Sequence, residues 1–292
     1  MNMMMRTAAC GLAAMVCVGS ARAEIAYGVT NRGRLISFDT NNPMSILTGM
    51  SITGLAGNEV IDGLDMRPND GMLYGLGSQN NLYRINRMTG AATLVGALNT
   101  ALNGSSFGFD FNPTGPVALR VVSDTNSNYR LPTPAANGNV LTDTNLAYVS
   151  GDVKFGMDPN VVHVAYTNNF LGATSTVLYG IDATHDTLVR FDAPNAGTLR
   201  TVGVLGMGGD ADINSIGGFD ISGLTGMAFA VTQNSSRSSS TLWGINLMTG
   251  AGTNLGTIGG GETLVGFTMI PSPASASVLA LAGMVSGRRR RR

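Results

Sequence analysis

The sequence predicts an all-β fold: a β-propeller-like ring of about five four-stranded blades, closed by pairing of the N- and C-terminal strands of the body. Three observations predict this fold. A short strand motif recurs at similar spacing, turn-forming residues follow its copies, and no helical period extends over three turns between the two ends of the chain.

The recurring motif has large apolar residues at its second and fourth positions and mostly small or polar residues at its third and fifth. This period of two is typical of a strand with one buried face. The copies are residues 35–39, 82–86, 188–192 and 242–246, a degenerate copy at 128–132 and a further match at 178–182.

Each motif has the neighbours expected within a four-stranded unit. The sequence Met-Thr-Gly-Ala follows it at 88–91 and 248–251, where Gly permits a tight turn, and another strand comes after the turn. A strand such as 72–75 precedes the motif. A Gly-rich strand comes before that one, at 63–66, 108–111 and 218–221. Four strands per unit is typical of a propeller blade.

The spacing of the motif predicts the number of blades and the closure of the ring. Successive copies lie 47, 46, 60 and 54 residues apart, which favours five blades over six, with an insertion in the fourth. The strand that starts at Ile25 lacks a Gly-rich partner before it, and the strand at 264–269 lacks a blade after it. Pairing these two would close the ring and remove exposed sheet edges. A β-sandwich or a β-solenoid is the alternative.

The N-terminal segment, residues 1–23, has the three successive regions of a secretory signal peptide. A positive start and an apolar run lead to Ala21-Arg22-Ala23, so we expect cleavage between Ala23 and Glu24. An uncleaved membrane anchor is the alternative, but the apolar run from 8 to 18 is short for ~30 Å of hydrocarbon. Both cysteines lie in this segment. The mature chain would therefore have no disulfide and no cysteine nucleophile.

The C-terminal segment, residues 270–292, has the succession of regions found in a sorting signal. Pro271, Ser272 and Pro273 precede an apolar stretch, and five arginines end the chain. We expect the protein to contact a membrane only through this tail, because a terminal arginine cluster prefers the cytoplasmic side. A basic tail that binds anionic surfaces is the alternative.

The body between these segments, residues 24–269, is acidic. Two of the 18 basic residues lie in the signal and five in the tail, so the body holds 11 basic and 18 acidic residues, a net charge of −7. This balance argues against nucleic acid as a partner.

Six segments of the body carry a family resemblance: 89–96, 106–113, 166–169, 172–174, 178–182 and 194–199. On these segments, the body resembles the domain of unknown function 4394 family of secreted bacterial proteins. The resemblance covers nearly all of 25–269, and departs from the family at 129–134 and 207–214. It implies export and a propeller-like fold, and it implies no catalytic residues. The tail resembles the PEP-CTERM sorting signal, which implies an exosortase-like enzyme as its partner. Ser272 stands where that signal usually has Glu.

The candidate metal ligands are Asp210, Asp212 and Asn214, whose alternating oxygens match the start of a calcium-binding loop. Ser215 and Ile221 stand where such a loop has Gly and Glu, so a solvated polar loop is the alternative. No other cofactor is expected.

The histidines and the arginines of the strand motif form two further groups of candidate side chains. His163 in a strand and His185 in a turn are far apart in the sequence, and ordinary packing explains each. Arg84, Arg130 and Arg190 share the third position of the strand motif, and either line equivalent faces of their blades or simply face solvent.

We therefore expect an exported, non-catalytic binding or structural protein at the cell surface, in the extracellular matrix or in the periplasm. Its partner would be an extracellular protein or glycan. The alternative is an extracytoplasmic propeller enzyme, a hydrolase or lyase, which requires acids that converge at the central channel. The aspartates of the Gly-rich strands, Asp65, Asp110 and Asp220, would be those acids.

Overall fold

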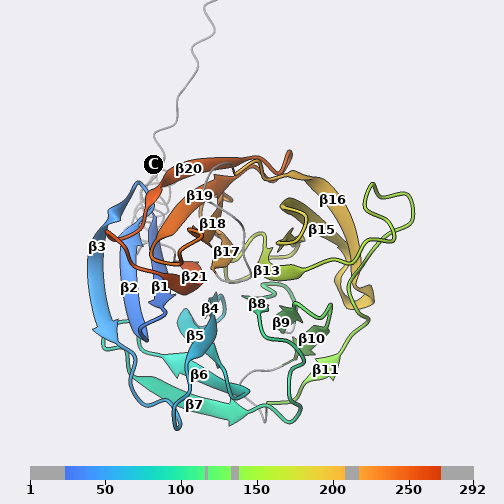
Figure 1. The fold of residues 1–292 in the computed structure, drawn as a ribbon. Coiled ribbons are helices and arrows are strands. Elements are labelled where there is room, and N and C mark those ends of the chain that lie inside the picture. Colours follow the sequence, from blue (N-terminus) through green and yellow to red (C-terminus); the bar gives the residue numbers. More distant parts are fainter. Residues whose placement is uncertain (1–23, 116–117, 133–137, 208–216, 271–292) are drawn as a thin grey trace, which may run out of the picture.

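Five twisted β-sheets surround a central axis, as the ribbon in Figure 1 shows. The structure is a computed structural model that describes residues 24–115, 118–132, 138–207 and 217–270. Neighbouring strands within each sheet are antiparallel, with one exception at the outer edge of the fourth sheet. The predicted five-bladed ring is confirmed.

The strands of each blade are given from the axis outward. Blade 1 comprises β21 (Leu264–Ile270), β1 (Ile25–Thr30), β2 (Arg34–Asp39) and β3 (Asn42–Ser51). Blade 2 comprises β4 (Ile61–Arg67), β5 (Met72–Gly77), β6 (Asn81–Ile85) and β7 (Ala92–Ala97). Blade 3 comprises β8 (Phe107–Phe111), β9 (Leu119–Ser123), β10 (Asn128–Leu131) and β11 (Leu141–Thr142). Blade 4 comprises β13 (Val161–Tyr166), β14 (Leu178–Asp182), β15 (Thr187–Ala193), β16 (Thr198–Val204) and β12 (Ala147–Tyr148). Blade 5 comprises β17 (Gly218–Ile221), β18 (Ala228–Gln233), β19 (Ser240–Ile245) and β20 (Gly252–Thr257).

The two ends of the body meet in blade 1. Strand β21 pairs antiparallel with β1, with Ile25 opposite Ile270 and Tyr27 opposite Thr268. Because β21 supplies the inner strand that β1 lacks, both edges of the open repeat disappear at this junction. The closure predicted from the sequence is therefore confirmed.

The recurring motif forms the third strand of its blade, counted from the axis, except for the match at 178–182, which is β14, the second strand of blade 4. In β6, Tyr83 and Ile85 are buried while Arg84 between them is exposed, as a period of two requires. The turn after it is held by Asn86, whose Oδ1 accepts a hydrogen bond from the Met88 backbone N–H at 2.9 Å. Gly90 completes the turn with φ of 75°, a conformation that favours glycine.

Blade 4 departs from the four-strand pattern. The chain leaves the short β11 of blade 3 and runs as β12 along the outer edge of blade 4, parallel to β16, before it crosses to the axis. Leu146 and Tyr148 of this segment are buried in the hydrophobic cluster between blades 3 and 4. The insertion predicted for the fourth unit therefore covers an interface between blades.

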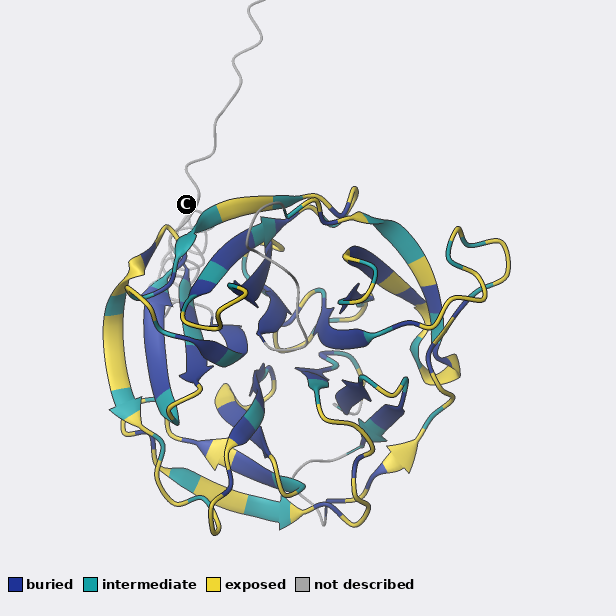
Figure 2. Ribbon diagram, in the orientation of Figure 1, coloured by how far each residue is buried: buried dark blue, intermediate teal, exposed yellow. Residues whose placement is uncertain are grey.

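The hydrophobic core is divided among the interfaces between blades. Five clusters of buried residues lie in the described part of the chain, each with members from two adjacent blades. Figure 2 shows the same division: the strands near the axis are mostly buried, whereas the outer strands carry many exposed residues. Each blade is therefore stabilised by its two neighbours.

The inner strands come very close to one another, and this explains their glycines. A Cβ atom added to Gly63 of β4 would lie 2.9 Å from Cβ of Phe109 in β8. One added to Gly218 of β17 would lie 2.5 Å from Cβ of Phe267 in β21. Such contacts are too short for a side chain, so these positions need glycine for close packing at the axis.

Among the described residues, the single helical element is the 3₁₀ turn Pro194–Ala196, and no helix there is long and apolar enough to cross a membrane.

Replacing Gly218 with alanine should destabilise the fold. The new methyl group would meet Cβ of Phe267 and, at 3.0 Å, its backbone nitrogen, and neither atom can move without shifting β21. We expect a loss of roughly 1–3 kcal/mol in the free energy of unfolding, measured by urea denaturation.

The matched control is Gly96→Ala in the outer strand β7, where the nearest atom would be 3.7 Å away, an ordinary contact. We expect this variant to stay within about 0.5 kcal/mol of the parent protein. Equal losses in the two variants would contradict the packing argument.

Candidate functional site

Three aspartates from the inner strands meet at the axis of the ring. They are Asp65 of β4, Asp110 of β8 and Asp220 of β17, and each is about 1% exposed. One carboxylate oxygen from each lies within 4.8 Å of the others. The structure therefore brings together the three acids on which the predicted enzyme alternative depends.

A relay of hydrogen bonds runs from blade to blade around the axis. Oδ2 of Asp65 accepts the backbone N–H of Phe111 in the next blade at 2.8 Å, and Oδ1 of Asp110 accepts that of Tyr166 at 3.2 Å. Oδ2 of Asp220 accepts the N–H of Met269 at 2.6 Å. Each of these aspartates therefore binds the inner strand of the following blade.

Thr268 of β21 takes the place of the aspartate in blade 1. Its Oγ1 accepts the backbone N–H of Met66 at 3.3 Å, which continues the relay into blade 2. In blade 4 the corresponding residue of β13 is Ala165, which has no polar side chain. The relay thus covers four of the five steps around the axis.

The contacts of Thr268 require a proton on one of the acids. Its Oγ1 lies 2.9 Å from Oδ1 of Asp65 and also 2.9 Å from Oδ2 of Asp220. A hydroxyl group has one proton to donate, so it can satisfy one carboxylate only. The second contact becomes a hydrogen bond when the other carboxyl group is protonated and donates.

The electrostatics of the cluster agree with a bound proton. Burial and the charge of Asp220 raise the pKa of Asp65 well above its usual range, and burial and the charges of Asp65 and Asp220 do the same for Asp110. Burial raises the pKa of Asp220 to about 6, although hydrogen bonds from Met269, Thr268 and Ile221 oppose the rise.

The three aspartates are buried from solvent, each about 1% exposed. A cavity of about 20 Å³ lies on the axis, and its walls come from the inner strands but do not include the three aspartates. A volume of this size holds about one water molecule. The three acids are buried and bond the inner strands of neighbouring blades, so they fasten the blades to one another.

The oxygens of the three aspartates are the ligand type that hard cations prefer. Most of them already accept hydrogen bonds from strand backbone or from Thr268. A cation would have to share these oxygens with donors that the fold holds in place.

The remaining sequence candidates lie apart from the axial aspartates or outside the described residues. Asp210, Asp212 and Asn214 fall in 208–216, outside the described residues. His163 lines the axial cavity, whereas His185 sits at the β14–β15 turn with Nδ1 2.9 Å from Oδ2 of Asp182. The only group of three or more metal-ligating side chains that the described chain forms is the axial one, and it contains neither histidine.

The three arginines of the strand motif do line equivalent faces. Arg84 lines a cavity of about 750 Å³, Arg130 one of about 550 Å³ and Arg190 one of about 410 Å³. The residues around these cavities include loops that follow the inner strands, such as Pro68, Asn112 and Asn169. The three cavities therefore open on the face of the ring where the inner strands end, which we call the loop face.

The loop between β13 and β14, residues 167–177, is the feature of this face that sequence reasoning missed. It starts in blade 4, yet its residues Phe170 and Leu171 line the 750 Å³ cavity together with residues of blade 2. Both are exposed, at 45% and 69%. Their apolar character in a polar loop was the available signal, but only the ring shows which surface they face.

The stability of the body should fall as the pH rises from about 4 to 8. Asp65, Asp110 and Asp220 hold protons in the folded state at a pH where they would ionise in the unfolded chain, so their contribution is present below the usual aspartate pKa and is lost as the pH rises through the folded pKa. The shift of the Asp220 pKa to about 6 alone corresponds to a loss on the order of 3 kcal/mol, measured by urea denaturation across this range.

The variant Asp110→Asn tests whether the axial aspartates cause this pH dependence of stability. Asparagine can still accept the N–H of Tyr166 but carries no charge, so we expect a flatter pH profile and greater stability than the parent protein at pH 8. Asp62 has a pKa raised to about 6 by burial and by Glu59. Its contribution to the pH dependence is the same in both proteins. Parallel profiles for the two proteins would contradict the shared-proton interpretation.

Comparison with known proteins gives a fold and a family. The chain is similar to a solved structure described as a nidogen/laminin complex, at 12% identity and a TM-score of 0.50, with 86% of this chain and 99% of that chain covered. It is also similar to regucalcin, described as a calcium-binding protein, from Agrobacterium tumefaciens, at 13% identity and a TM-score of 0.42, with 85% and 78% covered. No curated protein matches the chain. The model of the family "Domain of unknown function (DUF4394)" matches residues 34–268, and the chain therefore belongs to this family.

Proposed function

We propose that the chain is an exported, non-catalytic binding protein of the cell surface or the extracellular matrix, and that it holds a segment of an envelope or matrix protein in the 750 Å³ cavity of its loop face. The observation that carries this proposal is the make-up of that cavity. It combines exposed apolar side chains with arginines and contains one carboxylate.

The apolar part of the cavity suits a side chain from a partner. Met72 and Met88 of blade 2 are 45% and 76% exposed, and they face a space that Phe170 and Leu171 also line. Methionine adapts its shape to different partners, and exposed apolar groups that line one cavity are typical of a binding site.

The charged part of the cavity favours an acidic group beside that side chain. Arg84 and Arg87 both line it and supply guanidinium donors. The one carboxylate, Asp70, already bonds Nη1 of Arg67 at 3.1 Å and the hydroxyl of Tyr74 at 3.0 Å. A partner segment that joins apolar and acidic residues therefore complements the cavity.

The same residues argue against catalysis at this cavity. General acid–base chemistry needs a titratable group that is free to exchange a proton with the reacting atoms, and a nucleophile needs an adjacent base. Asp70 is the only carboxylate among the lining residues, which include no histidine, cysteine or lysine. The axial acids, which the enzyme alternative requires, are about 1% exposed and lie outside this cavity.

Export is supported by the position of the first strand. The predicted signal peptide, residues 1–23, is separated from the start of β1 at Ile25 by a single residue, Glu24. Glu24 is about 1% exposed, and its Oε1 accepts a hydrogen bond from the hydroxyl of Thr225 in blade 5. Removal of residues 1–23 would thus leave a complete blade 1. In the tail, we propose that Pro271, Ser272 and Pro273 are recognised by an exosortase-like enzyme and that any membrane contact runs through residues 270–292.

Mass spectrometry of the mature protein's two termini tests export and sorting. We expect the mature chain to start at Glu24, because Ala21 and Ala23 are the small residues that a signal peptidase requires. We also expect the C-terminal arginines to be absent. A mature protein that retains residues 1–23 would contradict export by this route.

A displayed library of random peptides tests the binding function. Peptides selected on the mature body should combine Asp or Glu with Leu, Met or Phe, because the cavity offers guanidinium and apolar groups together. The double variant Arg84→Gln, Leu171→Glu should weaken the binding of selected peptides by about a hundredfold, measured by calorimetry.

The control for this experiment is Arg237→Glu in the β18–β19 loop, which changes the charge by the same two units on the opposite face of the ring. We expect it to leave peptide affinity unchanged. Selection of no peptide above background, or equal weakening in the control, would contradict the proposal. Hydrolysis of a test ester or glycoside that is lost in Asp110→Asn would instead favour the enzyme alternative.

A further inference from the structure

A second site lies on the loop face between blades 3 and 4. Two cavities of about 550 and 410 Å³ adjoin there, because Asn112, Tyr166 and Pro194 line both of them. We call the two together the blade 3–4 groove. Arg120 and Arg130 line the larger cavity, and Arg190 and Asp192 line the smaller one.

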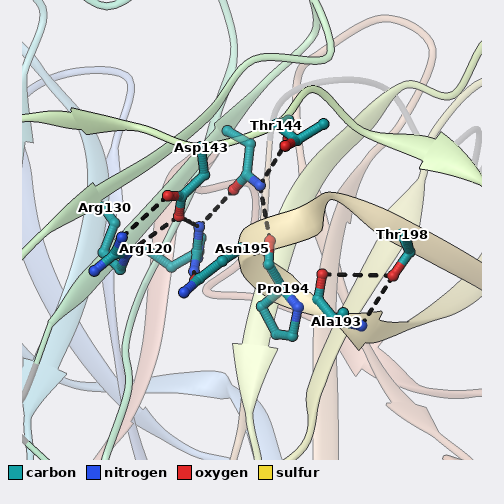
Figure 3. Close-up of polar contacts among 9 residues, drawn as sticks. Arg120, Arg130, Asp143, Thr144, Ala193, Pro194, Asn195 and Thr198 are labelled. Carbon is teal, nitrogen blue, oxygen red and sulfur yellow. Dashed lines mark hydrogen bonds and ion pairs between the residues drawn. The ribbon is translucent and has the colours of Figure 1, made fainter.

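In the larger cavity two arginines share one carboxylate, as Figure 3 shows. Nη1 of Arg120 lies 2.8 Å from Oδ2 of Asp143. Arg130 binds the same group through Nε and Nη2, each at 3.1 Å. Although burial opposes ionisation, hydrogen bonds from Arg130 and Arg120 lower the pKa of Asp143. Two positive charges therefore face one negative charge.

The second pair repeats this arrangement in the smaller cavity. Nη2 of Arg190 lies 2.7 Å from Oδ1 of Asp192, and Nε of Arg200 lies 2.8 Å from Oδ2 of the same carboxylate. The hydrogen bond from Arg190 is the main cause that lowers the pKa of Asp192. The groove thus has an excess of two positive charges on a body whose net charge is −7.

Part of this excess positive charge lies on Arg120, where water cannot screen it. Its side chain is 3% exposed. Nη1 also donates to Oδ1 of Asn128 and Nη2 to Oδ1 of Asn195, each at 2.6 Å, and these acceptors are neutral. Its Nε is buried and has no hydrogen-bond partner in the described part of the chain. A buried cation with incomplete compensation favours an anion nearby.

The neutral lining of the groove favours a sugar as the carrier of that anion. Asn112 and Thr114 offer amide and hydroxyl groups beside the arginines, which suits the hydroxyls of a glycan. Nucleic acid fits less well, because Tyr166 and Phe191, the aromatic residues of the lining, are 2% and 4% exposed and offer no face for base stacking. The ligand expected from this chemistry is a carboxylate-bearing sugar.

We propose that the blade 3–4 groove binds the uronate residues of an acidic extracellular polysaccharide through Arg130 and Arg190, with Arg120 as the buried charge that favours the anion. This site is separate from the peptide cavity of blade 2. The protein would then join an acidic polysaccharide to a protein partner, and either site can fail a test without the other.

Calorimetry of the mature body with trigalacturonate tests the proposal. Arg130→Gln and Arg190→Gln should each weaken binding by about tenfold, the size expected for one charge-assisted hydrogen bond. Each variant leaves its carboxylate paired, since Asp143 keeps Arg120 and Asp192 keeps Arg200. Both arginines are partly exposed, so an unchanged thermal unfolding midpoint should confirm that the fold is intact.

The control variant is Arg32→Gln in the exposed β1–β2 turn on the opposite face, which alters the total charge equally. The control ligands are methyl-esterified trigalacturonate, triglutamate and sodium sulfate. The proposal predicts binding of trigalacturonate alone, weaker at physiological than at low ionic strength and unchanged in Arg32→Gln. The absence of trigalacturonate binding would overturn it. So would equal binding of the ester, the acidic peptide or sulfate, or equal weakening in the control variant.

Discussion

The close approach of five inner strands at one axis is the constraint on which the rest of the structure depends. Glycine at Gly63 and Gly218 lets each strand pack against the aromatic residue of the next. Two residues further along, Asp65 and Asp220 accept backbone N–H groups across the same junctions. The glycine removes a steric obstacle, and the carboxylate replaces the sheet hydrogen bonds that strands of different blades cannot form. Together they join five separate sheets into one ring.

This way of closing the axis has consequences for electrostatics and for function. Carboxylates that must reach neighbouring strands also come near one another, and Thr268 lies between two of them. Burial raises the pKa values of these acids, which favours a bound proton in the cluster. Because the axis is filled by these contacts and by Phe109 and Phe267, ligands are left with the loop face, where the gaps between blades form cavities.

The loop face carries two kinds of binding surface. The cavity of blade 2 combines methionines with Phe170 and Leu171 of a loop from blade 4, whereas the blade 3–4 groove concentrates arginines around shared carboxylates. Arg84, Arg130 and Arg190 occupy one position of the repeat and yet face different surroundings. The loop that comes after each inner strand decides which surroundings they meet. A repeated scaffold with variable loops can in this way present distinct sites side by side.

The sequence by itself determined the strand period, the turns, the number of blades and the pairing of Ile25 with the last strand, because these depend on local alternation and on spacing along the chain. Its glycine-rich strands also identified the residues of the axis. Only the tertiary structure decided that Asp65, Asp110 and Asp220 converge, that Thr268 completes their contacts, and that residues 167–177 reach blade 2. The buried charge of Arg120 and its sharing of Asp143 likewise depend on blades 3 and 4 meeting. These features join residues up to about 200 positions apart, and their energies come from burial and charge proximity, which no local pattern encodes.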